Sequence, residues 1–433
     1  MIDLIVEIEI SGLNCVVGKI IGNDYNDARF SYTVDYLQME GSRPISLSLP
    51  LQTEAFSVHA TRNFFEGLLP EGFIRKCVAK EVHADTNDYL NILAVLGNEC
   101  LGAIRIVDNE AAIPVTSYKL LQDAEIKALA QEGATESVQL ITKSHLSLTG
   151  ASGKVGLYYE PESKKWFFPE GNAPSTHIVK QSHIRLKKIV ANEQLCMLTA
   201  KNLGIEIPES FIVNVGSDNK EDILFATRRY DRKFDEDSAV LNGLRVPYRL
   251  HQEDFAQALG IAAGDKYEKN GAAYLKRSMN LLRSFSSDPI ADQLKLWDIC
   301  IFDYLAGNTD NHIKNLSLLY SKDLKSVRLA PAYDIVSTMV YDSSTEDMAM
   351  SIGGIYNIND IDKKAFEREA LNVGLGKNMA LKHFDKMVAG FCDAIDKASF
   401  TLMSQGFEYV DVIKQEILQK GGIRSLSQRY VSP

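Results

Sequence analysis

The chain has 433 residues, of which 45% are hydrophobic and 24% charged, and its formal net charge is −10. The length predicts two or three packed units, and the composition is typical of a globular protein rather than a disordered one. The net negative charge argues against a protein that attracts nucleic acid through its overall electrostatic field, because phosphate binding depends on basic surface. A local basic patch or a basic partner could still bring DNA near.

Cysteines and the N-terminal stretch bear on the cellular compartment. Six cysteines lie far apart without a CxxC pair, which favours reduced thiols over disulfides or a zinc site. The stretch MIDLIVEIEISG alternates apolar and polar residues, so it predicts a first strand and not a signal peptide. No run reaches the roughly 18 apolar residues of a membrane span. We therefore expect a cytoplasmic protein with no membrane partner.

Residues 1–108 mix short strands with helices, and we expect them to form an N-terminal α/β subdomain. The stretches IVEIEI, CVVGKII and ARFSYTV predict strands, and LGAIRIV predicts the strand that closes this region. Between them, HATRNFFEGLLPEGFIRKCVAKEV predicts helix, with an interruption at Pro70 because proline disrupts a helix interior. A polar, alanine-rich segment at about 119–133 then predicts a connecting helix.

Two further regions follow, and the whole chain predicts an α+β fold. Residues 138–250 read as strands around one helix, in the order β-β-β-α-β-β that is typical of a kinase small lobe. Residues 251–433 are mostly helical. The segment DPIADQLKLWDICIFDYLAGN is apolar at helical spacing through Leu294, Trp297, Ile301 and Leu305, and it ends at Gly307, as helices often do. We expect a kinase-like two-lobed fold in which this region is the C-terminal lobe.

The loop GNTDNHIKN, which leaves this helix, carries the main candidate residues. Asp310 and Asn315 have the D-x-x-x-x-N spacing of a kinase catalytic loop, which presents a base and an amide oxygen from one short segment. Asp334, in LAPAYDIVS, follows a predicted strand pair, and its carboxylate suits a hard ion such as Mg²⁺. A solvated turn and a helix N-cap at Asp334 are the alternatives. The loop's other two asparagines are expected to be scaffolds.

The upstream region holds candidate phosphate-binding groups. SLTGASGKVGLYY supplies Gly150, Gly153 and Gly156 between strand-like stretches, where backbone N–H groups can approach phosphates; a plain hairpin turn is the alternative. Lys180 lies in an apolar strand, where a buried ammonium would need an anionic partner, unless it stands at an exposed edge. Glu193 begins the next helix and could pair with this lysine or serve only as an acid near the helix N-terminus.

The stretch TRRYDR stands where a hinge between lobes would lie. Tyr230 could face an adenine and Asp231 a ribose hydroxyl. A strand end at the surface, with solvated arginines, is the alternative interpretation.

Taken together, these motifs resemble the HipA-type serine/threonine kinases, the toxins of HipBA toxin–antitoxin modules, over essentially the whole chain. The matching stretches occur in the family's order; they are RPISLSLPLQ, NFFEGLLPEG, LGNECLGAIRI, SLTGASGK, STHIVK, RRYDR, RLHQEDFAQALG, GNTDNHIKNLSLL and LAPAYDIVS. The resemblance implies an ATP- and Mg²⁺-dependent protein kinase that is inactivated by autophosphorylation. It also implies a HipB-like helix-turn-helix antitoxin as partner, and targets in translation such as an aminoacyl-tRNA synthetase.

The resemblance also implies a role for individual residues. Asp310 is the catalytic aspartate, and Asn315 and Asp334 bind Mg²⁺. Ser147 is the autophosphorylated residue, with Thr149 as a second candidate. The candidates for ATP binding are Gly150, Ala151, Ser152, Gly153, Lys154, Lys180, Arg228, Tyr230, Asp231, His312 and Lys314. Of these, Lys314 could steady the γ-phosphate, whereas His312 has more the character of a structural hydrogen bonder.

Two departures from the family pattern affect these roles. The loop GASGK replaces the common GAQEK, which removes a carboxylate but keeps Lys154, and Arg228 stands where the family often has glutamate. Two other interpretations stay open: a small-molecule kinase, and a non-catalytic module that binds an antitoxin and acts as a corepressor. Operator DNA would then be contacted mainly through the antitoxin, since this chain is acidic.

Overall fold

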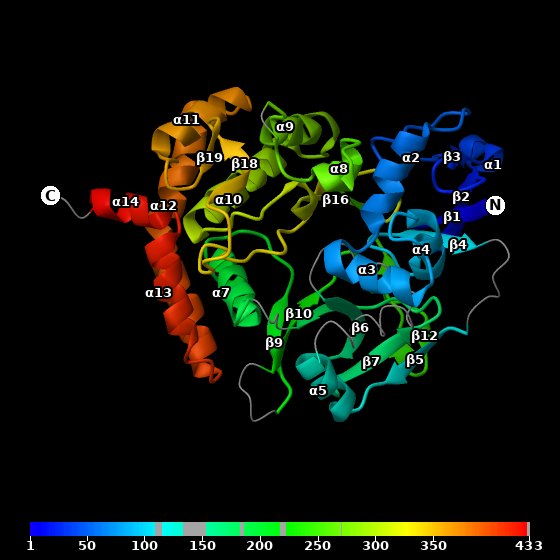
Figure 1. Ribbon diagram of the computed structural model, residues 1–433, viewed down its shortest axis with the longest axis horizontal. Helices are drawn as coiled ribbons and strands as arrows, with labels where there is room; N and C mark the ends of the chain where they lie inside the picture. Colours follow the sequence, from blue (N-terminus) through cyan, green and yellow to red (C-terminus); the bar gives the residue numbers. More distant parts are fainter. Residues whose placement is uncertain (109–114, 133–152, 182–185, 217–221, 270, 431–433) are drawn as a thin grey trace. The chain divides into compact units, whose positions relative to one another are not determined.

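The computed structural model describes the chain except residues 109–114, 133–152, 182–185, 217–221, 270 and 431–433 (Figure 1). The architecture is α+β and divides into two compact units. Unit 1 comprises Met1–His183, Val213–Gly264 and Leu318–Val327, and unit 2 comprises Ile184–Ile212, Asp265–Ser317 and Arg328–Pro433. Residues 1–108 thus share a unit with most of the strands at 138–250. The finer three-part division remains a prediction.

A four-stranded antiparallel sheet opens unit 1. Its strands are β1 (Ile2–Ile10), β2 (Leu13–Gly22), β3 (Arg29–Tyr32) and β4 (Ile104–Asp108), in the order β3-β2-β1-β4. Leu4, Val6 and Ile8 are buried on one face of β1, as the alternating pattern predicts. The accompanying helices are α1 (Val34–Gln38), α2 (Val58–Phe65), η1 (Glu66–Leu68), α3 (Gly72–Glu81) and α4 (Tyr89–Leu96). Pro70 separates η1 from α3, so the predicted interruption is confirmed.

The second sheet of the chain has six strands in the order β5-β7-β6-β8-β10-β9. They are β5 (Ser117–Leu120), β6 (Lys154–Glu160), β7 (Lys165–Glu170), β8 (His177–Gln181), β9 (Ser210–Asn214) and β10 (Ile223–Arg228). With helix α7 (Ile189–Asn202) between β8 and β9, the predicted β-β-β-α-β-β order is confirmed. Strand β5 was not predicted, and the connecting helix α5 (Asp123–Glu132) begins only after it.

Short strands make up much of the remaining irregular chain. β11 (Arg232–Lys233) pairs with β14 (Tyr248–Arg249), and β12 (Val240–Leu241) pairs with β13 (Leu244–Arg245). Strands β15 (Gln252–Asp254), β16 (Ser317–Tyr320) and β17 (Val327–Leu329) form a three-stranded sheet. The stretch HQEDFAQALG, whose pattern predicts helix throughout, is therefore β15 followed by the four-residue α8 (Phe255–Ala258).

Helices dominate unit 2. They are α7, η2 (Ala263–Asp265, whose last residue lies in this unit), α9 (Tyr274–Phe285), α10 (Pro289–Ala306), η3 (Ile313–Asn315), α11 (Lys363–Asn372), α12 (Lys377–Ser404), α13 (Val410–Lys420) and α14 (Ile423–Tyr430). Of the predicted apolar face of α10, Trp297, Ile301 and Leu305 are fully buried, which confirms the prediction for these three, whereas Leu294 is only partly buried. The Trp297 indole N–H donates to the Ala380 carbonyl of α12 at 3.1 Å. The hairpin of β18 (Asp347–Ile352) and β19 (Ile355–Asn357) was not predicted.

The thiols and the apolar helices are the last features of the fold that concern function. All six cysteines are free; Cys100, Cys196 and Cys300 are buried, whereas Cys392 is exposed. In the part of the chain that the structure describes, no three His, Cys, Asp or Glu side chains are grouped closely enough to hold a metal ion. Within the same residues, no helix has both the length and the apolarity to cross a membrane.

Candidate active site

The loop that follows α10 is fixed by a buried carboxylate within that helix. Gly307 ends α10 in the left-handed conformation (φ 74°), which glycine adopts without strain. The Asp303 carboxylate, 1% exposed, accepts from the side-chain amides of Asn308, at 2.9 Å, and Asn311. Burial raises the pKa of Asp303 to about 7, although these two amides oppose the shift. Asn308 and Asn311 are therefore scaffolds of the loop.

Asp310, the predicted base, is exposed at the tip of this loop. Its Oδ1 accepts a hydrogen bond from the Tyr267 hydroxyl at 2.6 Å. Its carbonyl oxygen accepts from the backbone N–H of His312 at 2.7 Å and from the side-chain Nδ2 of Asn315 at 3.1 Å. This bond uses the amide nitrogen of Asn315 and leaves the amide oxygen as the atom of this side chain that could bind a hard cation.

His312 and Lys314 lie on the same loop, and both are buried. The His312 ring packs edge-on against Tyr267, with the ring centroids 5.3 Å apart and the planes at 81°. The carbonyl oxygen of Lys314 accepts from the Tyr333 hydroxyl at 3.0 Å, and Tyr333 precedes Asp334. The bond from Tyr333 joins the loop to the segment that carries Asp334. The role of His312 stays a prediction.

Asp334 lies in an irregular segment after β17, and no helix begins there, so the helix N-cap alternative is wrong. Its backbone is left-handed, with φ 57°, a conformation that is uncommon for a residue with a side chain and that concentrates at functional sites. A few residues later, Thr338 connects this segment to Thr309 by hydrogen bonds. The Thr338 hydroxyl accepts from the Thr309 backbone N–H at 2.8 Å and bonds to the Thr309 hydroxyl at 2.7 Å. The hydrogen bonds between Thr309 and Thr338 therefore join the Asp310 loop to the Asp334 segment within unit 2.

Lys180 occupies a central position in the six-stranded sheet of unit 1. Strand β8 lies between β6 and β10, where Lys180 is 9% exposed and has Lys154 and Phe225 as its neighbours across the strands. The Lys180 ammonium lies 5.5 Å from the centroid of the Phe225 ring. The alternative of an exposed strand edge is therefore wrong. Glu193 is buried in α7 and belongs to unit 2.

The glycine-rich loop is described only at its C-terminal end. Gly153 is buried and leads directly into β6, which begins at Lys154. Five of the predicted residues lie outside the described part of the chain: Ser147, Thr149, Gly150, Ala151 and Ser152.

The predicted hinge residues fall into two groups. Arg228 is exposed at the end of β10, and Tyr230 is half-buried, with its hydroxyl donating to the side-chain oxygen of Gln252. Asp231, in contrast, is 2% exposed. Its carboxylate accepts from the Arg229 guanidinium at 2.8 and 2.9 Å, from the Gly102 N–H at 2.7 Å and from Gln252 Nε2 at 3.2 Å. With its oxygens bonded to protein donors, Asp231 has a structural role, which corrects the expected contact with a ribose hydroxyl.

A buried ion network surrounds Asp231, and the sequence motifs did not predict it. Glu99 accepts from Arg229 at 2.9 Å, from Arg232 at 2.9 Å and from Arg249 at 2.8 Å. Burial alone would raise the pKa of Glu99, but the three guanidinium groups hold this pKa well below its usual range. The interpretation of TRRYDR as solvated arginines is therefore wrong for Arg229 and Arg232, whereas Arg228 is exposed at the strand end as that interpretation expects. In the sequence, Glu99 is the lone acidic residue in the largely apolar stretch LGNECLGAIRI, and this pattern could have indicated a buried charge.

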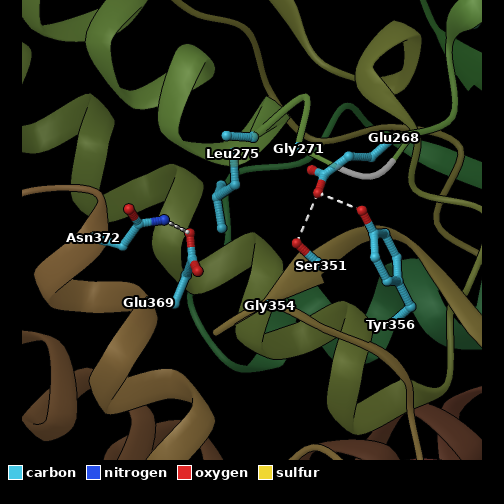
Figure 2. A pocket seen from close by; sticks show the side chains of 9 residues that line it. Glu268, Gly271, Leu275, Ser351, Gly354, Tyr356, Glu369 and Asn372 are labelled. Carbon is cyan, nitrogen blue, oxygen red and sulfur yellow. Dashed lines mark hydrogen bonds between the residues drawn. The ribbon is translucent and has the colours of Figure 1, made fainter.

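A cavity of about 260 Å³ lies in unit 2 beside the β18–β19 hairpin (Figure 2). On its wall, Glu268 accepts from the Ser351 hydroxyl at 2.7 Å and from the Tyr356 hydroxyl at 2.9 Å. The Glu268 N–H donates to the Ala349 carbonyl at 2.9 Å, and the Ala349 N–H donates to the Thr309 carbonyl at 3.0 Å. One strand residue thus links the wall of the cavity to the loop of Asp310.

Comparison with known proteins bears on the family of the chain. The family model described as "HipA-like C-terminal domain" matches residues 146–395, and the one described as "HipA N-terminal domain" matches residues 10–107. This chain belongs to the HipA family of kinases. A family relative from Sinorhizobium fredii, named "Putative kinase Y4mE", is 31% identical over 88% of this chain and 89% of its own length. The family resemblance seen in the motifs is confirmed.

Two further matches come from Shewanella oneidensis. The protein named "Serine/threonine-protein kinase toxin HipA" is 26% identical over 84% of this chain and 82% of its own length. The second is a solved structure of a complex of HipA, HipB and its operator DNA. This chain matches one chain of that structure with a TM-score of 0.78 and 24% sequence identity. That match covers 95% of this chain and 96% of the other. It confirms the expected fold.

Proposed function

We propose that the protein is an ATP- and Mg²⁺-dependent serine/threonine protein kinase. The observation that carries the proposal is the junction of the Asp310 loop and the Asp334 segment through Thr309 and Thr338. This junction holds together a candidate base and the two candidate metal ligands, Asn315 and Asp334. Phosphoryl transfer depends mainly on positioning and on charge stabilisation, so such a fixed set of groups is what the reaction requires.

Each residue has a distinct task in this proposal. Asp310 orients the hydroxyl of the substrate serine or threonine and accepts its proton. The Asn315 amide oxygen and the Asp334 carboxylate suit Mg²⁺, which prefers oxygen ligands and keeps waters and phosphate oxygens in its shell. Lys180 binds the phosphates of ATP, which supplies the transferred phosphoryl group.

Nucleotide binding involves further groups from the sequence assignment. The backbone around Arg228 and Tyr230 borders the adenine, and the stretch from Gly150 to Lys154 covers the phosphates. Lys314 steadies the γ-phosphate. Asp231 is not part of this set, because protein donors take up its carboxylate.

We further propose that the kinase acts in the cytoplasm as the toxin of a toxin–antitoxin pair. Support comes from the Shewanella HipA structure, whose title includes HipB and operator DNA. With a net charge of −10, this chain would reach an operator mainly through a basic antitoxin of the HipB type. The protein substrate is of the translation class, such as an aminoacyl-tRNA synthetase, and phosphorylation of Ser147 or Thr149 switches the kinase off.

The test compares the natural chain with Asp310→Asn. This substitution keeps the size of the side chain but removes the negative charge that accepts a proton. Growth arrest on expression, and transfer of labelled phosphate from ATP to lysate proteins, should both disappear. Thermal melting should change little, because Asp310 is exposed. Full toxicity and full phosphoryl transfer in the variant would contradict the proposal.

The same assays separate the two other interpretations. A small-molecule kinase would phosphorylate small alcohols and no protein in the lysate. A purely non-catalytic corepressor would raise the operator affinity of its antitoxin while both the natural chain and Asp310→Asn transfer no phosphate.

A further inference from the structure

The side chain of Tyr267 contacts the candidate base directly. Its hydroxyl donates to Oδ1 of Asp310 at 2.6 Å, a distance typical of a strong O–H···O bond to a carboxylate. The Tyr267 side chain is substantially exposed, at 45%, so burial of a large apolar ring does not explain its position. The two residues are 43 positions apart in the sequence.

The ring of Tyr267 is fixed by the catalytic loop itself. It packs edge-on against His312, at 5.3 Å between centroids, and the Lys266 ammonium lies 5.4 Å from its centroid. The Lys266 carbonyl also accepts a hydrogen bond, at 3.4 Å, from the backbone N–H of Ile313 in that loop. The phenol is therefore held against the loop by its ring as well as by its hydroxyl.

The backbone on the C-terminal side of Tyr267 is anchored by Glu268, whose side-chain bonds to Ser351 and Tyr356 are drawn in Figure 2. The Glu268 carboxylate accepts from the hydroxyls of Ser351 and Tyr356 and, at 2.9 Å, from the backbone N–H of Tyr274. Its own N–H donates to the Ala349 carbonyl at 2.9 Å. These hydrogen bonds at the next residue leave Tyr267 little freedom to move away from Asp310.

We propose that Tyr267 is a positioning residue for phosphoryl transfer, which holds Asp310 Oδ1 so that Oδ2 accepts the proton of the substrate hydroxyl. An exposed aspartate otherwise samples several rotamers, and transfer requires the base within hydrogen-bond reach of the attacking oxygen. A carboxylate has two oxygens, so one can be held while the other works. The inference rests on the proposed kinase function and adds a residue that the sequence motifs did not include.

The experiment uses the full chain and the variant Tyr267→Phe, which removes the hydroxyl but keeps the ring against His312. Transfer of labelled phosphate from ATP to lysate proteins should fall about tenfold in kcat, because one interaction made to the base is lost. The KM for ATP and the melting temperature should not change, since neither depends on this hydroxyl. An unchanged or increased kcat would overturn the proposal; an increase would mean that the phenol competes with the substrate for Asp310.

A further variant makes the result specific. Tyr304→Phe removes another phenol hydrogen bond in the same unit, to the Ile361 carbonyl at 2.9 Å and not to Asp310, and should leave kcat unchanged. If both phenylalanine variants lose activity equally, the loss reflects a general disturbance of the unit and not the bond to Asp310, which overturns the proposal.

The outcomes also separate this inference from the proposed function. Activity that survives Asp310→Asn contradicts the kinase proposal itself. Activity that is lost with Asp310→Asn but kept with Tyr267→Phe contradicts only the role of Tyr267.

Discussion

Asn192 of α7 and Ser337 form a two-way hydrogen-bonded pair. The Asn192 side-chain Nδ2 donates to the Ser337 carbonyl at 2.8 Å, and the Ser337 N–H donates back to Asn192 Oδ1 at 3.2 Å. Both residues are fully buried. Because Ser337 closely follows Asp334 in the chain, this pair fixes the Asp334 segment to a helix, in addition to the link through Thr338.

Replacing Asn192 should therefore weaken both stability and metal binding. In Asn192→Ala the buried N–H and C=O of Ser337 lose their partner, and unpaired buried backbone groups cost about 1–3 kcal/mol each. We expect the free energy of unfolding to fall by about 3 kcal/mol, and the Mg²⁺ concentration needed for half-maximal activity to rise. Urea unfolding and a Mg²⁺ titration of phosphate transfer would measure the two effects.

A matched control lies on the same helix. Asn202 is exposed, and its side chain donates a hydrogen bond to the Ala394 carbonyl at 3.0 Å. Asn202→Ala should cost about 1 kcal/mol or less and leave the Mg²⁺ dependence unchanged. A similar shift in Mg²⁺ dependence for both variants would mean that α7, and not the Asn192–Ser337 pair, controls the site.

Thr338 provides a second test of the same segment. Its hydroxyl bonds with the backbone and hydroxyl of Thr309 and donates to the Gly307 carbonyl at 3.1 Å. Thr338→Val keeps the shape but removes these side-chain bonds, so the Asp310 loop loses part of its connection to the Asp334 segment. The backbone N–H groups of Thr338 and Met339 still donate to the Gly307 carbonyl. We expect kcat to fall by about tenfold or more, with about 1–3 kcal/mol lost in stability. Thr338→Ser, which retains the hydroxyl, should keep most of the activity, and equal losses in the two variants would contradict this account.

Local patterns in the sequence predicted the parts of the site that depend on neighbouring residues. The apolar spacing of α10, the cap at Gly307 and the step from Asp310 to Asn315 all act over a few residues, so they are readable from the chain. The scaffold role of Asn308 and Asn311 followed from the same loop, although its anchor, Asp303, did not.

The contacts between distant segments could not be predicted from the sequence. The spacing of apolar and polar residues indicates local structure, but it does not indicate which distant residues come into contact. Tyr267 meets Asp310 across 43 positions and Asn192 meets Ser337 across 145. The expected contact of Asp231 with a ribose hydroxyl was wrong for the same reason. The short motif suggested a hinge that a nucleotide could reach. In the structure, Glu99, which is far away in the sequence, pairs with Arg229 and Arg232 in a buried ion network around Asp231.

Replacing Glu99 should lower the stability of the folded chain. Its carboxylate is 1% exposed and neutralises Arg229, Arg232 and Arg249, so its removal leaves buried guanidinium groups with less compensating negative charge. Breaking a buried ion pair by removing one partner costs about 3–5 kcal/mol. Glu99→Gln, which keeps the shape, should lose stability of this size in urea unfolding. The exposed pair of Lys269 and Asp265 offers a control, since Asp265→Asn should have little effect.

Asp303 makes the stability of unit 2 depend on pH. Its pKa in the folded chain is about 7, well above the ordinary aspartate value, so between about pH 4 and 7 the folded state holds a proton that the unfolded state has lost. The stability contributed by the protonated form is fully present below about pH 4 and is lost as the pH rises through about 7. The variant Asp303→Asn mimics the protonated form and cannot titrate.

The stability of the natural chain, relative to Asp303→Asn, should therefore fall as the pH rises from about 4 to about 7, by about 4 kcal/mol at most, and stay level above that range. Burial also raises the pKa of Glu253 in unit 1 to about 7, but this group is present in both proteins and cancels in the difference. Urea unfolding of both chains at several pH values measures the effect. Asp342→Asn, at a fully exposed carboxylate, is the control, and a difference that stays flat for Asp303→Asn would show that Asp303 is ionised throughout this range.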